Sequence, residues 1–144
     1  MNHIIDGIYL GDLGDAMKAR RANDGIGTLY VHEFEVQNYT PTYHVPIMVK
    51  VDTPPMPIGD DDFSHYTGEY SVASMDRILK CRDIIQEWSA KGDPLLVHCH
   101  GGIERSPLTL AFWLFLTGRE HSLDNAYRFI RDRRPVVEDR RYWI

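Results

Sequence analysis

Apolar positions in this sequence follow two periods, one typical of strands and one typical of helices. Four short segments rich in apolar or β-branched residues predict strands, at residues 4–12, 25–34, 42–52 and 94–98. The first contains glycines at two turn positions, so we expect a strand or the edge of a hairpin there. The last, "PLLVH", is apolar nearly throughout, as expected for the buried centre of a sheet.

Four other segments predict helices. In one, apolar side chains recur at the spacing of a single helix face; another, "SPLTLAFWLFLTG", is apolar nearly all round and predicts a buried helix. The predicted helices cover residues 13–24, 74–88, 106–118 and 122–135. Because strands alternate with helices, we expect an α/β fold in which helices flank a central, mostly parallel sheet. We expect residues 1–144 to form a single domain.

Composition and charge narrow the class of protein. The chain has 144 residues, of which 43% are hydrophobic and 26% charged, and no apolar run approaches the roughly 20 residues of a membrane-spanning helix. A net charge of −5 argues against broad nucleic-acid binding. The basic segment 128–141 contains interleaved acids, which favour a solvated helix end. We expect a cytoplasmic protein with neither nucleic acid nor membrane as partner; the oligomeric state does not follow from these observations.

The stretch "LLVHCHGGIERSPLTLAFWLF" carries the chemistry. Cys99 follows a predicted strand, and a short loop with two glycines leads from it to the predicted buried helix. The N–H groups and dipole of a helix N-terminus favour anions and lower the pKa of a thiol. Arg105, six positions after Cys99, can grip the same anion through two hydrogen bonds. We therefore expect a thiolate that attacks a bound phosphate, with Ser106 stabilising the sulfur as leaving group.

These residues resemble a known signature. "VHCHGGIERSP", with His-Cys, five residues and Arg-Ser, is similar to the signature loop of the cysteine-based protein tyrosine phosphatases. The segments "IIDGIYLGDLGDA", "YHVPIMVKVD" and "LDNAYRFIRDRRPVV" are similar to elements of the small dual-specificity phosphatases, so the resemblance covers nearly the whole chain. It implies that Cys99 is the nucleophile, Arg105 the phosphate-binding arginine and Ser106 the hydroxyl that assists breakdown of the phosphocysteine.

The resemblance also implies roles for the rest of the loop. His98 would shape the loop and support the thiolate without touching substrate. Glu104 would repel a phosphate dianion if it pointed inward, so we expect its carboxylate to face away and pair with a basic side chain. The backbone amides that would hold the phosphate oxygens are those of His100, Gly101, Gly102, Ile103, Glu104 and Arg105.

A leaving oxygen needs a proton, which a carboxylic acid must supply. The family takes it from a loop after the strand that "VPIMVKVD" resembles, and Asp52 stands at the end of that segment. The spacing to Cys99 is longer than the family's, because an extra loop spans residues 53–70. That loop brings Asp60, Asp61 and Asp62 as alternative general acids.

We expect a cysteine-dependent phosphatase that needs no metal and no other cofactor. Phosphorylated proteins are the favoured substrates, with phosphotyrosine first and phosphoserine or phosphothreonine in addition. An RNA 5′-phosphatase, a small-metabolite phosphatase and a phosphoprotein-binding pseudophosphatase stay open as alternatives. The loop lacks the lysines of the superfamily's lipid phosphatases, which disfavours phosphoinositides.

The two cysteines and the adjacent histidines allow other interpretations. His98, Cys99 and His100 are consecutive, so an extended strand cannot turn all three side chains toward one metal ion. Cys81 falls on the apolar face of a predicted helix, which favours a core position over a redox partner for Cys99. The aromatic residues Phe112, Trp113 and Phe115 are predicted to lie in the core.

Overall fold

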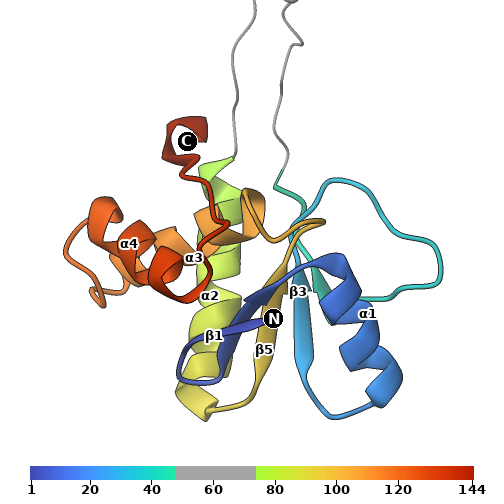
Figure 1. The fold of residues 1–144 in the computed structure, drawn as a ribbon. Coiled ribbons are helices and arrows are strands. Elements are labelled where there is room, and N and C mark those ends of the chain that lie inside the picture. The colour runs from blue at the N-terminus through green and yellow to red at the C-terminus, as the bar shows by residue number, and fades with distance from the viewer. Residues whose placement is uncertain (48–73) are drawn as a thin grey trace, which may run out of the picture.

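The computed structural model describes residues 1–47 and 74–144, and its sheet has five strands within these ranges (Figure 1). The strands are β1 (Asn2–Ile5), β2 (Ile8–Gly11), β3 (Gly27–Tyr30), β4 (Tyr43–His44) and β5 (Leu95–His98). Their order across the sheet is β1-β2-β5-β3-β4. Only the β1–β2 pair is antiparallel. The expected α/β fold with a mostly parallel sheet is therefore confirmed.

Helices cover both faces of the sheet (Figure 1). They are α1 (Leu13–Ala22), α2 (Met75–Lys91), α3 (Arg105–Leu116) and α4 (Leu123–Arg133), followed by a short 3-10 helix (Arg141–Trp143). The predicted start of the last helix at Ser122 is confirmed, because Ser122 is the N-cap of α4 and accepts from the Asn125 N–H. The first helix ends where predicted, at the left-handed C-cap Asn23, and its N-cap is Asp12, which accepts from the Asp15 N–H. No helix in the described ranges is long and apolar enough to cross a membrane.

The core consists of two apolar clusters on opposite faces of the sheet. On one face α1 packs through Ala16 and Ala19 against Tyr30 and Leu96. The other face carries the larger cluster, which joins the sheet to α2, α3 and α4 and includes the fully buried Trp113. Burying these apolar side chains supplies the main stabilising free energy of the fold. Helix α3 lies inside the larger cluster, so its N-terminus is held by packing.

Two details differ from the predictions. Of the strand expected at 42–52, residues 42–47 are described, and in them β4 spans Tyr43–His44. The N–H groups of Val45 and Ile47 continue the bonding, to the carbonyls of Tyr30 in β3 and of Val31 after it. Phe115 is 38% exposed, so the prediction that it belongs to the core is wrong. It lies in the last turn of α3, where the helix emerges from its neighbours.

Because β2, β3 and β5 are parallel, the chain leaves all three at the same edge of the sheet. Cys99 directly follows β5, Leu13 comes two positions after the end of β2, and His32 and Glu33 come two and three positions after the end of β3. The Cys99 residue and the loop that leads from it into α3 therefore lie at this edge of the sheet.

Candidate active site

A cavity of about 330 Å³ lies between the ends of these strands and the start of α3. Its walls are His32, Cys99, His100, Gly101, Ile103, Glu104 and Arg105. Cys99 is only 4% exposed and lies between β5 and the loop that leads into α3. The structure thus brings together the cysteine, the glycine loop and the arginine that the sequence singled out.

Hydrogen bonds to the Cys99 sulfur favour its ionised form. Burial opposes ionisation of the thiol, but the Ser106 hydroxyl, 3.2 Å from Sγ, and backbone N–H groups of Ser106, Gly102 and Ile103 outweigh it. The Gly102 N–H donates to Sγ at 3.3 Å. Together they lower the pKa of Cys99 below its ordinary value. A larger fraction of the sulfur is therefore ionised at neutral pH than in a free thiol, and the thiolate is the form that acts as a nucleophile.

His98 supports this loop from inside the core. Its side chain is fully buried, and burial lowers its pKa to about 4, so the ring is neutral at neutral pH. Nδ1 lies 3.0 Å from the Cys99 carbonyl, which can only accept, so Nδ1 carries the proton. Nε2 then accepts from the Tyr39 hydroxyl at 2.6 Å. The pair fixes the backbone at Cys99 without entering the cavity's lining.

The carbonyl groups of the loop are all bonded on its outer side. Leu13 N donates to the His100 carbonyl at 2.9 Å, and Glu138 N donates to the Ile103 carbonyl at 2.9 Å. Arg134 bonds the two carbonyls between them, Gly101 through Nη2 at 3.1 Å and Gly102 through Nε at 2.9 Å. With these carbonyls held outward, the peptide N–H groups are turned toward the sulfur and the cavity, as an oxyanion requires.

Gly102 is required by two independent features of the loop. Its φ is +67°, in the left-handed region that favours glycine. A Cβ at this position would meet the Gly11 carbonyl oxygen at 2.5 Å and Arg134 Nη2 at 2.8 Å. The close approach of the loop to β2 and to Arg134 therefore excludes a side chain here.

Arg105 is fixed at the cavity by residues that precede it far in sequence. Nε donates to the Ile47 carbonyl at 3.0 Å, and Nη2 donates to Glu33 Oε1 at 2.8 Å. The guanidinium also lies over the Trp143 ring, 5.7 Å from its centroid. Of the five N–H groups of a guanidinium, three have no acceptor in the described part of the chain. These three can bond an oxyanion in the cavity.

Glu104 pairs with a basic side chain, as expected: Arg140 Nε lies 3.2 Å from its Oε2. The prediction that segment 128–141 is merely a solvated helix end is wrong for Arg134 and Arg140. After α4 the chain turns back toward the loop, anchored by the buried Val137. The turn brings both arginines onto the loop that holds Cys99.

Sequence reasoning missed three residues that hold this site: Glu33, Tyr39 and Arg134. Glu33 is 72 positions from Arg105, and Tyr39 is 59 positions from His98, so no local pattern could have linked them. For Arg134 the available signal was the Arg-Pro pair at the end of the last helix. The segment that contains this pair resembles the closing helix of the small dual-specificity phosphatases, but nothing in the pattern indicates that the Arg134 side chain reaches the loop.

The remaining predicted residues lie elsewhere. Asp52, Asp60, Asp61 and Asp62 fall outside the described residues. Cys81 is fully buried in the larger core cluster, and burial raises its pKa to about 12, which makes it an inert thiol. In residues 1–47 and 74–144, no group of three or more His, Cys, Asp or Glu side chains is placed to hold a metal ion.

Comparisons with known proteins agree on the family and the fold. Residues 8–144 match the family model "Dual specificity phosphatase, catalytic domain". Human dual specificity protein phosphatase 16 is 40% identical over 58 residues, which are 40% of this chain and 9% of that relative.

Solved structures of phosphatases resemble the whole chain. Human DUSP28 superposes with a TM-score of 0.63 at 19% identity and covers 99% of this chain and 90% of its own. The human tyrosine phosphatase-like serine/threonine/tyrosine-interacting protein superposes with a TM-score of 0.67 at 16% identity, covering 99% and 88%. At such identities the likeness supports the fold alone. Since the family model spans nearly all of the sequence, the chain belongs to the family of dual specificity phosphatase catalytic domains.

Proposed function

We propose that this protein hydrolyses phosphate monoesters on proteins through a phosphocysteine intermediate on Cys99. Phosphotyrosine is the main substrate, with phosphoserine and phosphothreonine in addition. The observation that carries the proposal is the Cys99 sulfur, bonded by Gly102 N–H and Ser106 in a loop whose four carbonyls are bonded outward. Two buried free thiols fit a reducing compartment, and we propose the cytoplasm.

In the first step the Cys99 thiolate attacks phosphorus. The S–P bond forms as the P–O bond to the substrate oxygen breaks, and Asp52 gives its proton to that oxygen. The loop N–H groups and the free N–H groups of Arg105 stabilise the charge on the three phosphoryl oxygens. Asp60, Asp61 and Asp62 are the alternative donors.

In the second step water attacks the phosphocysteine. The carboxylate that gave its proton now takes one from the water, and the S–P bond breaks to release inorganic phosphate. The Ser106 hydroxyl, which already bonds Sγ, stabilises the thiolate as it leaves. His98 keeps the backbone at Cys99 in place throughout.

The test is turnover of 4-nitrophenyl phosphate and of a phosphotyrosine peptide between pH 5 and 7, with and without a metal chelator. We expect turnover that the chelator does not affect and that Cys99→Ser abolishes. Tight binding of the phosphopeptide by the unaltered protein without turnover would instead identify a phosphoprotein-binding module. Turnover of RNA 5′-phosphates or small phosphate esters but not of phosphopeptides would move the proposal to those substrates.

The general acid is tested by four substitutions, Asp52→Asn, Asp60→Asn, Asp61→Asn and Asp62→Asn. Loss of the acid slows release of a poor leaving group, such as an alkyl alcohol, far more than release of 4-nitrophenol. We expect this pattern for Asp52→Asn. If one of the other three variants shows it and Asp52→Asn does not, the assignment moves to that aspartate.

A further inference from the structure

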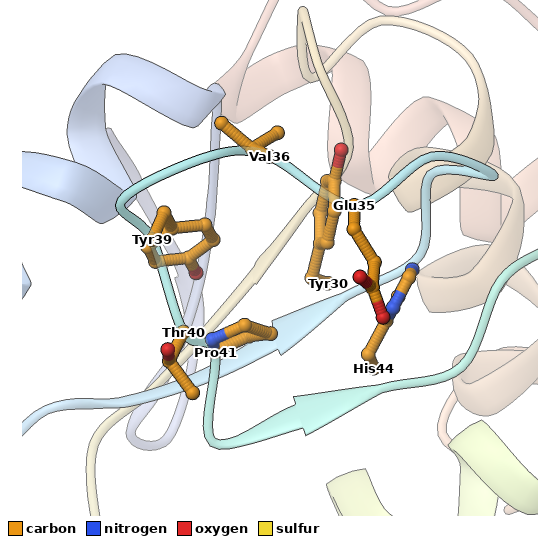
Figure 2. Close-up of a pocket in the computed structure, with 7 residues that line it drawn as sticks. All are labelled: Tyr30, Glu35, Val36, Tyr39, Thr40, Pro41 and His44. Atoms are coloured by element: carbon orange, nitrogen blue, oxygen red, sulfur yellow. The ribbon is translucent and has the colours of Figure 1, made fainter.

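A second cavity, of about 290 Å³, lies against the β3–β4 connection (Figure 2). Figure 2 shows Tyr39 on one side of it, Glu35 and His44 on the other, and Tyr30 between them. The Tyr30 and Tyr39 rings meet edge to face with centroids 5.9 Å apart. Val36, Thr40 and Pro41 complete the walls. None of these residues lines the cavity that contains Cys99.

The walls of this cavity offer aromatic rings and hydrogen-bond acceptors. Glu35 is exposed and, within the described residues, its carboxylate has no hydrogen bond or ion pair. His44 Nε2 bonds the His32 carbonyl at 2.8 Å, so in the neutral ring Nδ1 is an acceptor. Among residues 1–47 and 74–144, no lysine or arginine lines the cavity. Rings and a carboxylate around one space attract a cation.

A neighbouring hollow has the opposite charge. It shares Tyr39 and Thr40 with this cavity but is lined by Arg20 and Arg21. The two neighbouring hollows therefore favour side chains of opposite charge, an acidic one beside Arg20 and Arg21 and a basic one beside Glu35.

The same stretch of chain forms a wall of both the catalytic cavity and the second one. His32 lines the catalytic cavity and Glu33 bonds Arg105, whereas Glu35 and Val36 line the second cavity. Phe34 lies between these pairs and is 68% exposed, the largest exposure of a big apolar side chain in the described residues. Aromatic residues are enriched where protein surfaces meet, so Phe34 is suited to contact a protein segment that crosses from one hollow to the other.

The cavities are also joined through stacked rings. Tyr30 lies between His44 and His98, with ring centroids 4.8 and 4.9 Å away and nearly parallel planes. His98 in turn bonds the Cys99 carbonyl. Tyr30, which lines the second cavity, therefore packs against His98, which holds the backbone at Cys99. Because these rings are buried, the core fixes the position of the cavity relative to Cys99.

We propose that this cavity binds a lysine or arginine side chain of the phosphoprotein substrate, a few residues from the phosphorylated one. The substrate segment crosses the loop over Phe34, with its phosphate at Cys99 and its basic side chain between Tyr30, Tyr39 and Glu35. This inference rests on the proposed function, because it names the class of substrate that the same site prefers.

The test compares phosphotyrosine peptides that carry one lysine at each of the flanking positions in turn, with all other positions neutral. For the unaltered protein we expect one or two positions at which lysine raises kcat/KM about fivefold to tenfold, the scale of a cation held by rings and a carboxylate. Glu35→Gln should remove this gain, and Glu35→Lys should turn it into a penalty. Turnover of 4-nitrophenyl phosphate, which has no flanking residues, should be unchanged in both variants.

Glu87→Gln is the matched control, because it removes the same charge from the exposed surface of α2. If lysine gives no gain at any position, or if Glu87→Gln removes the gain as fully as Glu35→Gln, the proposal is wrong. If neither peptide nor 4-nitrophenyl phosphate is turned over, the proposed function fails instead. Binding of the same peptides, carrying a fluorescent label, then decides the present proposal. Glu35→Gln should weaken binding of the lysine-containing peptides and leave binding of the neutral peptides unchanged.

Discussion

At the scale of single residues, the Ser106 hydroxyl controls the acidity of the Cys99 thiol. Its hydrogen bond to Sγ and the backbone N–H bonds together overcome the burial that opposes ionisation. In Ser106→Ala the hydroxyl is lost while burial stays, so we expect the pKa of Cys99 to rise. The measurement is the pH dependence of iodoacetamide alkylation at Cys99, followed by mass spectrometry.

Cys81 serves as the internal control in that experiment, because its buried thiol with a raised pKa should stay unmodified in both proteins. Alkylation of Cys81 would show that the substitution had loosened the core. An unshifted midpoint for Cys99 in a protein that leaves Cys81 unmodified would mean that the backbone N–H groups alone ionise the sulfur.

His98 links the same site to the stability of the fold. Burial lowers its pKa to about 4 in the folded protein, against 6.5 for an unperturbed histidine. Between these values the unfolded chain binds a proton at this position and the folded chain does not, so the free energy of unfolding rises with pH. Lowering the pH from 7 to 4 should therefore cost about 3 kcal/mol through this residue.

Urea unfolding at several pH values measures this effect. Other groups also titrate in this range, so the comparison is with His98→Asn, in which the Asn side chain stays neutral. We expect the variant to be less stable at pH 7 and to lose less stability on acidification. Parallel pH profiles for the two proteins would contradict a buried neutral histidine.

At the scale of elements, the end of α4 acts on the start of α3. Arg134, at the C-cap of α4, bonds the carbonyls of Gly101 and Gly102 and also Asn2 Oδ1 at 2.8 Å. In Arg134→Met two loop carbonyls lose their partners, so the N–H groups of the loop lose their fixed direction. We expect orthovanadate to inhibit about tenfold less tightly and the pKa of Cys99 to rise.

Arg128→Met is the control for that change, since Arg128 lies exposed on the same helix. It should leave inhibition, the alkylation midpoint and thermal stability unchanged. If Arg134→Met folds and binds vanadate as tightly as the control, the loop holds its shape without the arginine.

The elements also show what a sequence can specify. The N-termini of α1 and α4 follow from the N-caps Asp12 and Ser122, because an N-cap side chain bonds a backbone N–H only three residues further along the chain. The residues that orient the catalytic loop come instead from α1, the β3–β4 connection and the segment after α4. Such partners are set by the topology of the sheet, which local spacing does not encode. Cys99 and Arg105 were predictable because the loop that joins them is short.

The single-domain organisation over residues 1–144 and the identity of the general acid stay predictions. The acid's loop falls in residues 48–73, outside the described ranges. Cys99 and Arg105 lie within these ranges, whereas Asp52, Asp60, Asp61 and Asp62 lie outside them.

At the scale of the whole molecule, the loop that holds Cys99 connects the two ends of the chain. Asn2 and Leu13 near the N-terminus, and Arg134, Glu138 and Arg140 near the C-terminus, are all joined to it by hydrogen bonds, Asn2 through Arg134. A ligand that orders the loop therefore stabilises segments far from each other in sequence. Binding to the folded state alone raises stability by mass action.

Orthovanadate, a phosphate analogue, tests this coupling. At one hundred times its dissociation constant we expect a gain of about 2.7 kcal/mol, equivalent to a rise in Tm of roughly 5–10 °C for a chain of this size. Arg105→Met should lose most of the rise, because the guanidinium is the main cation of the cavity.

Hydrogen exchange should show where the stabilisation acts. The N–H groups of Leu13 and Glu138, which bond loop carbonyls, should gain protection, whereas that of Gly118, bonded to Phe115 at the far end of α3, should gain none beyond the global effect. A raised Tm with unchanged exchange at Leu13 and Glu138 would show that vanadate binds without tightening the loop against the two ends of the chain.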